Sequence, residues 1–138
     1  MIRLIIWSKP HARYIFAAWI LTILGVSSIP SVPTLQIQIA HTDIRLDYLI
    51  HFCEYGILAL MAFLSFTNNE FKISSRKLFI ITISLISFAV LDEVHQKLIP
   101  GRAFNMKDIM SNISGIVGAL VFSIVVFRKI MQRYKKPD

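Results

Sequence analysis

The chain has 138 residues, of which 55% are hydrophobic and only 17% are charged, and its mean hydropathy is +0.62. A soluble domain typically carries about 25% charged residues, so the composition excludes an ordinary soluble protein and indicates one integral membrane domain over residues 1–138. The net charge of +7 does not indicate nucleic-acid binding, because the basic residues lie in short groups between apolar runs rather than in one patch.

Four apolar runs predict four transmembrane helices and therefore an all-α bundle. The first run also resembles the apolar part of a cleaved signal peptide, but the three runs that follow favour an uncleaved helix. The third run reaches Leu91 after 14 residues. Such a run rises only about 21 Å, so its helix must continue through Asp92 and Glu93 to cross a bilayer. The predicted helices cover about residues 14–29, 48–66, 78–98 and 109–127.

The loops between these helices predict the orientation and one further element. Of the 15 Lys and Arg residues, most lie in the N-terminal segment, the second loop and the C-terminal tail. Because cytoplasmic segments are enriched in Lys and Arg, both termini are predicted to be cytoplasmic. In the first loop, Leu35, Ile37 and Ile39 alternate with Gln36 and Gln38. This two-residue period predicts a short extended segment at a membrane interface.

Polar residues in three of the predicted helices share one face of their helix, because most are separated by three or four residues. With cytoplasmic termini, all three faces lie in the outer half of the membrane. A charged side chain at the bilayer centre costs roughly 3 kcal/mol on insertion scales, so such residues usually face a protein interior and mark a functional site. The candidate residues are Asp47, His51, Glu54 and Tyr55 in the second helix, Asp92, Glu93 and Gln96 in the third, and Asp108 and Asn112 in the fourth.

Arg102 is the tenth candidate and follows Pro100 and Gly101, whose order fits the central positions of a type II turn. Its planar guanidinium suits a carboxylate or a phosphate. One interpretation pairs Arg102 with Asp108 or Asp92, because buried charges need partners. The other reserves Arg102 for an anionic external ligand, such as a lipid headgroup or a peptide carboxylate.

Metal and cofactor chemistry receive little support from the sequence, and none is predicted. His51 and Glu54 form one H-x-x-E spacing, but His95 points away from Asp92 on a helix. Cys53 is the only cysteine, so there is no cysteine-based metal site. No Ser–His or Cys–His arrangement favours a nucleophile, whereas acid–base chemistry or a proton relay by clustered carboxylates stays open. Hydrogen bonding between helices is the simpler interpretation.

Small residues in the fourth helix have the spacing of a packing surface. Ser111, Gly115 and Ala119 form one small-x-x-x-small row, and Ser114 with Gly118 forms a second. Rows of this kind let helix backbones approach each other closely within a bilayer. We therefore expect these residues to serve helix packing rather than chemistry.

Two motifs in these segments resemble VanZ-like membrane proteins. The first is D-x3-H-x3-Y over residues 47–55, and the second is D-E-x2-Q-x3-P-G-R-x5-D-x3-N-x2-G-x2-G over residues 92–118. The resemblance covers about residues 14–127 and implies a small transmembrane helix bundle in the bacterial cytoplasmic membrane. For the named member of the family, it implies resistance to the glycopeptide teicoplanin. The chain has Tyr48 and Asn105 where family members often have Lys and an acid, so an identical ligand preference does not follow.

The polar faces lead to four functional hypotheses, with enzyme activity left open. The favoured one is a cell-envelope protein that binds an external ligand, such as a cell-wall precursor or a glycopeptide. The second is an intramembrane enzyme that acts on a lipid-linked substrate with Asp92, Glu93 or His51 as general acid or base. A small ion-coupled transporter, which would need to form a homo-oligomer, and a structural subunit of a larger complex are the others. All four have the lipid bilayer as a partner.

Overall fold

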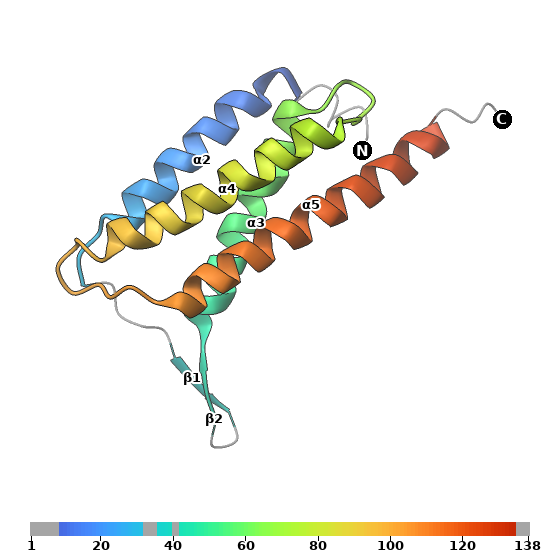
Figure 1. Ribbon diagram of the computed structural model, residues 1–138. Helices are drawn as coiled ribbons and strands as arrows, with labels where there is room; N and C mark the ends of the chain where they lie inside the picture. The colour runs from blue at the N-terminus through green and yellow to red at the C-terminus, as the bar shows by residue number, and fades with distance from the viewer. Residues whose placement is uncertain (1–8, 32–35, 40–41, 135–138) are drawn as a thin grey trace.

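A computed structural model describes residues 9–31, 36–39 and 42–134, most of which belong to four α-helices (Figure 1). The predicted helical bundle is therefore confirmed, although α5 continues well past its predicted end at residue 127. The elements are the 3-10 helix η1 (Lys9–His11), α2 (Ala12–Ser27), the strands β1 (Gln36–Ile39) and β2 (Thr42–Arg45), α3 (Leu46–Phe66), α4 (Ser75–Gln96) and α5 (Met106–Tyr134).

Three of the helices, α3, α4 and α5, are long and apolar enough to cross a membrane. Only 28–33% of the most apolar segment of each helix is buried inside the bundle. Large apolar side chains such as Phe79, Leu91 and Phe122 are instead exposed on the outer faces. A surface of this kind suits hydrocarbon rather than water, which supports a membrane protein. With 16 residues, α2 is shorter than the other three helices.

Successive helices run in opposite directions, and the most extensive helix–helix contact joins α3 to α5 (Figure 1). On another side of α3, the indole Nε1–H of Trp19 in α2 donates to the backbone carbonyl of Glu54 at 3.0 Å. The core between the helices is apolar and contains few large polar side chains away from one end of the bundle. Its fully buried large members are Ile23, Tyr55, Leu58, Phe63 and Ile116.

The closest approach of α3 and α5 occurs at two glycines, Gly56 and Gly115. A Cβ atom added to Gly115 would overlap the carbonyl oxygen of Phe52, and would lie 3.0 Å from its carbonyl carbon and 3.1 Å from the nitrogen of Gly56. All three atoms are backbone atoms, so a rotamer change cannot relieve the overlap. At Gly118, the nearest atom to an added Cβ is the Cζ of Phe52, at 3.9 Å. Gly115 is therefore the residue of the small-residue rows that sets the distance between these helices.

Strands β1 and β2 form an antiparallel hairpin that pairs residue 36 with residue 45 and residue 39 with residue 42. The hairpin projects from the bundle at the start of α3 (Figure 1). The predicted extended segment is confirmed over residues 36–39, whereas Leu35 lies outside the described residues. The all-α prediction missed β2, because residues 42–45 contain only one apolar residue, Ile44, and show no alternation.

Candidate functional site

Four helix ends meet at one end of the bundle, where α2 and α4 finish and α3 and α5 begin (Figure 1). This arrangement brings together polar side chains from distant parts of the chain, and most of them are buried. We call this group the polar cluster. Its members are Ser27, His51, Tyr55, Asp92, Glu93, Gln96, Arg102, Asp108 and Asn112.

One carboxylate oxygen of Asp92 accepts hydrogen bonds from side chains of three helices. Asp92 lies near the end of α4 and is only 2% exposed. Its Oδ2 accepts hydrogen bonds from Ser27 Oγ at 3.0 Å, from Tyr55 Oη at 2.9 Å and from Gln96 Nε2 at 3.2 Å. These donors come from α2, α3 and α4 respectively. Hydrogen bonds to a charged acceptor are the stronger kind, so Asp92 fixes the relative positions of three helix ends.

Arg102 connects the polar cluster to the carbonyl end of α2. Its Nη1 donates to Gln96 Oε1 at 3.0 Å, its Nη2 to the carbonyl of Val26 at 2.9 Å and its Nε to the carbonyl of Ile29 at 3.2 Å. The last carbonyls of a helix have no partner within the helix and carry partial negative charge, so a cation there is stabilising. Arg102 therefore caps α2 and orients the amide of Gln96.

The predicted pairing of Arg102 with Asp92 or Asp108 is wrong, since no such ion pair occurs among the residues that the structure describes. The turn that precedes Arg102 explains the difference. Gly101 has φ of +77°, and the N–H of Arg102 donates to the carbonyl of Ile99 at 3.1 Å, as predicted for a type II turn. This turn directs Arg102 towards the end of α2, a segment that sequence spacing alone does not place beside it.

A second part of the polar cluster involves the start of α5. Glu93 is fully buried, and its Oε1 accepts a hydrogen bond from the backbone N–H of Asn105 at 2.8 Å. The Nε2 of His51 lies 3.8 Å from Oδ2 of Asp108. These two side chains are 14% and 10% exposed, so they form the partly accessible margin of an otherwise buried group.

Several buried polar atoms of this region have no hydrogen-bond partner within the described part of the chain. A polar group left in this condition typically costs about 1–3 kcal/mol. Three of the atoms are carboxylate oxygens, which accept hydrogen bonds but cannot donate them when ionised. The site is therefore arranged to receive additional donors. The atoms are Asp92 Oδ1, Glu93 Oε2, Asp108 Oδ1, His51 Nδ1, His95 Nδ1 and both side-chain polar atoms of Asn112.

The remaining predicted residues lie around this group. Asp47 is half-buried in the first turn of α3, and the half-buried Glu54 lies on the side of α3 that contacts α2. In the fourth predicted helix, Gly115 is buried, whereas Ser114 and Gly118 are exposed and Ser111 is half-buried. Within residues 9–31, 36–39 and 42–134, no three His, Cys, Asp or Glu side chains are grouped as metal ligands.

Ser27 is the member of the polar cluster that the sequence did not predict. It lies in the last turn of an otherwise apolar helix, next to Ser28, which has the same side chain. Ser27 donates to Asp92, whereas the hydroxyl of Ser28 donates to the carbonyl of Leu24 in its own helix. Nothing in the local sequence distinguishes these two serines, because the difference depends on the rotation of α2 against α4.

Comparison with known protein families gives a match to VanZ/LLP1 over residues 6–128. Searches of curated proteins and of solved structures found no match. The matched segment contains the polar cluster, α2, α3, α4 and most of α5. The chain therefore belongs to the VanZ/LLP1 family.

Proposed function

We propose that this chain is a multi-pass protein of the bacterial cell envelope, whose polar cluster faces outwards and binds an external ligand. The observation that supports binding is the set of buried carboxylate oxygens without partners, on Asp92, Glu93 and Asp108. Acidic groups are costly within apolar helices and are usually retained for function. A ligand that donates N–H or O–H groups to these oxygens removes part of that cost.

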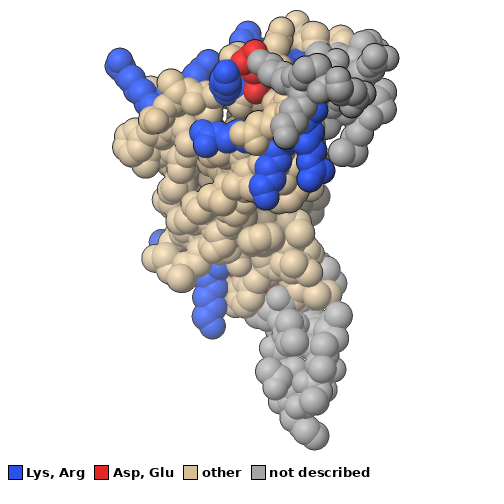
Figure 2. All heavy atoms as spheres, turned by 90° about the vertical axis from the view of Figure 1, so that its right-hand side faces the viewer, with Lys and Arg blue, Asp and Glu red and all other residues tan. Residues whose placement is uncertain are grey.

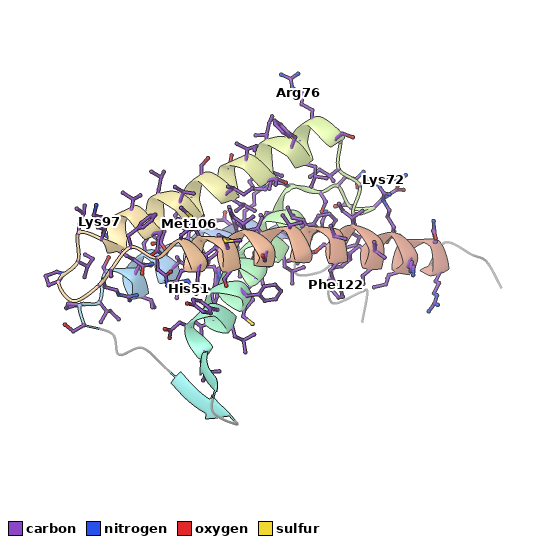
Figure 3. All side chains as sticks on the ribbon, turned by 60° about the horizontal axis from the view of Figure 1, so that its bottom comes forward. His51, Lys72, Arg76, Lys97, Met106 and Phe122 are labelled. Carbon is purple, nitrogen blue, oxygen red and sulfur yellow. The ribbon has the colours of Figure 1, made fainter. Side chains whose placement is uncertain are left out.

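Charge at the opposite end of the bundle supports the orientation. Figure 2 shows Lys and Arg side chains gathered at one end, above a broad band without charge. Lys72 and Arg76 lie at this end and Lys97 lies at the other (Figure 3). Because cytoplasmic segments are rich in basic residues, this distribution favours an outward-facing polar cluster. The described basic residues of the loop before α4, of the first turn of α4 and of the end of α5 are Lys72, Arg76, Lys77, Arg128, Lys129 and Arg133.

In the same proposal, α2 forms a fourth crossing. A helix of 16 residues spans about 24 Å, and an Arg side chain such as Arg13 at its cytoplasmic end extends this length by snorkelling to the interface. With four crossings, both chain ends lie in the cytoplasm. The short length of α2 also places Ser27 at the depth of Asp92, to which it is bonded.

The chemical class of the ligand is indicated by which groups of the polar cluster already have hydrogen-bond partners within the protein. Three of the five N–H donors of Arg102 already donate to protein acceptors, so Arg102 keeps only two for an anionic ligand. A ligand rich in ammonium, amide or hydroxyl donors instead meets the three carboxylate oxygens that have no partner within the described residues. Glycopeptides of the teicoplanin class are the candidates that the family resemblance suggests.

The test compares glycopeptide susceptibility with direct binding. We expect expression of the wild type in a sensitive Gram-positive host to raise the inhibitory concentration of teicoplanin, and Asp108→Asn or Glu93→Gln to remove most of this effect at equal membrane levels. Glu70→Gln, which removes one carboxylate at the other end of the bundle, should behave as the wild type. Isothermal titration of the detergent-purified protein with teicoplanin should give the same ranking. Equal susceptibility of all four strains would contradict the glycopeptide proposal.

A second candidate is favoured by the separation between His51 Nε2 and Asp108 Oδ2. A histidine beside a carboxylate, at the margin of a buried site, is a common general acid–base pair. In this alternative the chain is an intramembrane enzyme that acts on a lipid-linked substrate. Lipid mass spectrometry of cells with the wild type and with His51→Gln distinguishes the two candidates, because a binding protein leaves the lipid profile unchanged.

A further inference from the structure

A second candidate site lies at the basic end of the bundle, far from the polar cluster. A hollow of about 510 Å³ opens there between the loop that joins α3 to α4 and the last turns of α5. This volume falls within the roughly 300–1,000 Å³ that is typical of small-molecule sites. The residues used below are Phe71, Lys72 and Ile73 of the loop, and Ile124, Arg128 and Met131 of α5.

The loop wall of this hollow is fixed by contacts with the core. Phe71 adopts a positive φ of 54°, is 3% exposed, and stacks on Phe127 of α5 with 4.6 Å between ring centroids. The side-chain oxygen of Asn68 accepts the backbone N–H groups of Glu70 and Lys72 at 3.0 and 2.8 Å. The loop is thus held against α5 by contacts within the chain itself.

The lining combines apolar groups with two cations and one carboxylate. Ile73, Ile124 and Met131 supply the apolar part. Lys72 and Arg128 supply two positive charges, against the single negative charge of Glu70. Lys72 forms an ion pair with Glu70 at 2.7 Å, which occupies one of its three N–H donors. For the Arg128 guanidinium, no hydrogen bond or ion pair occurs within the described part of the chain. Its fork of donors is therefore available to a phosphate.

The surroundings strengthen this positive charge. Lys77, Lys129 and Arg133 lie on the adjoining helix ends. The ammonium of Lys9 lies 5.0 Å from the centre of the Phe71 ring. Basic pockets between helix ends at the cytoplasmic surface are suited to anionic lipid headgroups, because the phosphate meets the cations while the acyl chains stay against apolar side chains.

We propose that this hollow binds the headgroup of an anionic phospholipid, with Arg128 and Lys72 on the phosphate and with Ile124 and Met131 against the start of the acyl chains. The proposal does not rest on the function of the polar cluster. A free phosphate shares the charge of the headgroup but has no chains, so the two ligands are separable by experiment.

The test is native mass spectrometry of the full chain in detergent, titrated with phosphatidylglycerol or phosphatidylcholine. We expect the wild type to prefer phosphatidylglycerol. The double variant Lys72→Gln/Arg128→Gln should bind phosphatidylglycerol about 25-fold more weakly, since each basic group near an anionic surface typically contributes about fivefold. The matched control Lys129→Gln/Arg133→Gln removes the same number of charges at the same end of the bundle, outside the hollow, and should weaken binding by less than about threefold.

Three results would overturn the proposal. These are equal binding of both lipids by the wild type, equal losses in the two double variants, and displacement of phosphatidylglycerol by equimolar inorganic phosphate. If the first double variant does not fold, Gln132→Glu gives the same answer, because it adds a negative charge to the lining at an exposed position. Gln132→Glu should weaken phosphatidylglycerol binding while Gln132→Met leaves it unchanged, and equal binding by these two variants would also count against the site.

Discussion

The contact between α3 and α5 depends on the absence of a side chain at Gly115, and Gly115→Ala tests this directly. The added Cβ would meet backbone atoms of Phe52 and Gly56 at 3.0–3.1 Å or closer. Overpacking of this kind typically costs about 1–3 kcal/mol. Replacing glycine by alanine inside a helix returns about 1 kcal/mol through helix propensity. We therefore expect a net loss of up to about 2 kcal/mol in the free energy of unfolding.

Gly118→Ala is the control, because it makes the same substitution on the same helix one turn away. Its Cβ would meet one ring atom of Phe52, at 3.9 Å. The propensity gain is common to both variants and cancels, so Gly115→Ala should be less stable than Gly118→Ala by about 1–3 kcal/mol. Denaturant unfolding in detergent, followed by far-ultraviolet circular dichroism, measures this difference. Equal stability of the two variants would refute the close backbone contact.

Three further substitutions test the polar cluster and its turn. Tyr55→Phe removes one donor to Asp92 without changing the packing, so unfolding in detergent should show a loss of about 1.5–3 kcal/mol, and no loss would rule out this hydrogen bond. Ser27→Ala should likewise cost about 1.5–3 kcal/mol, and a double-mutant cycle with Tyr55→Phe should be non-additive, because both hydroxyls donate to one oxygen. Gly101→Ala should cost about 1–3 kcal/mol of stability in melting experiments, since the positive φ of Gly101 disfavours a side chain. Gly25→Ala is the control and should not destabilise the protein, because no atom lies within 4 Å of the added Cβ.

The helices of this chain were predictable because each one is an apolar run bounded by charged or turn-forming residues. The third helix is the most informative case. Its apolar run ends at Leu91, yet the length needed to cross a bilayer predicted that it continues, and α4 does end at Gln96. The length requirement also predicted that Asp92 and Glu93 lie within the helix rather than in a loop. The thickness of the bilayer therefore predicted the extent of this helix better than local helix propensity did.

The internal connections of the site were less predictable, because they depend on how helices are rotated against each other. Helical periodicity predicted that Tyr55, Asp92 and Gln96 each lie on a polar face, and the structure joins them by hydrogen bonds. Periodicity could not select Ser27 or the partners of Arg102. Two of the three acceptors of Arg102 are backbone carbonyls at and just after the end of α2, and backbone groups have no signature in a sequence.

The contacts of α2 bear on whether this helix is part of the site or a separable segment. Three hydrogen bonds join α2 to the polar cluster, from Ser27 to Asp92, from Gln96 to Ser27 and from Arg102 to the carbonyl of Val26. A fourth, from Arg102, reaches the carbonyl of Ile29 just past the end of the helix. If a signal peptidase removed α2, Asp92 would lose one donor, and Gln96 and Arg102 would each lose one acceptor. The lost donor to the buried Asp92 costs about 1–3 kcal/mol, whereas the contact of Arg102 is exposed to solvent and its loss costs less. α2 is therefore a structural part of the polar cluster, which is consistent with the capping of its last carbonyls by Arg102 from a distant part of the chain.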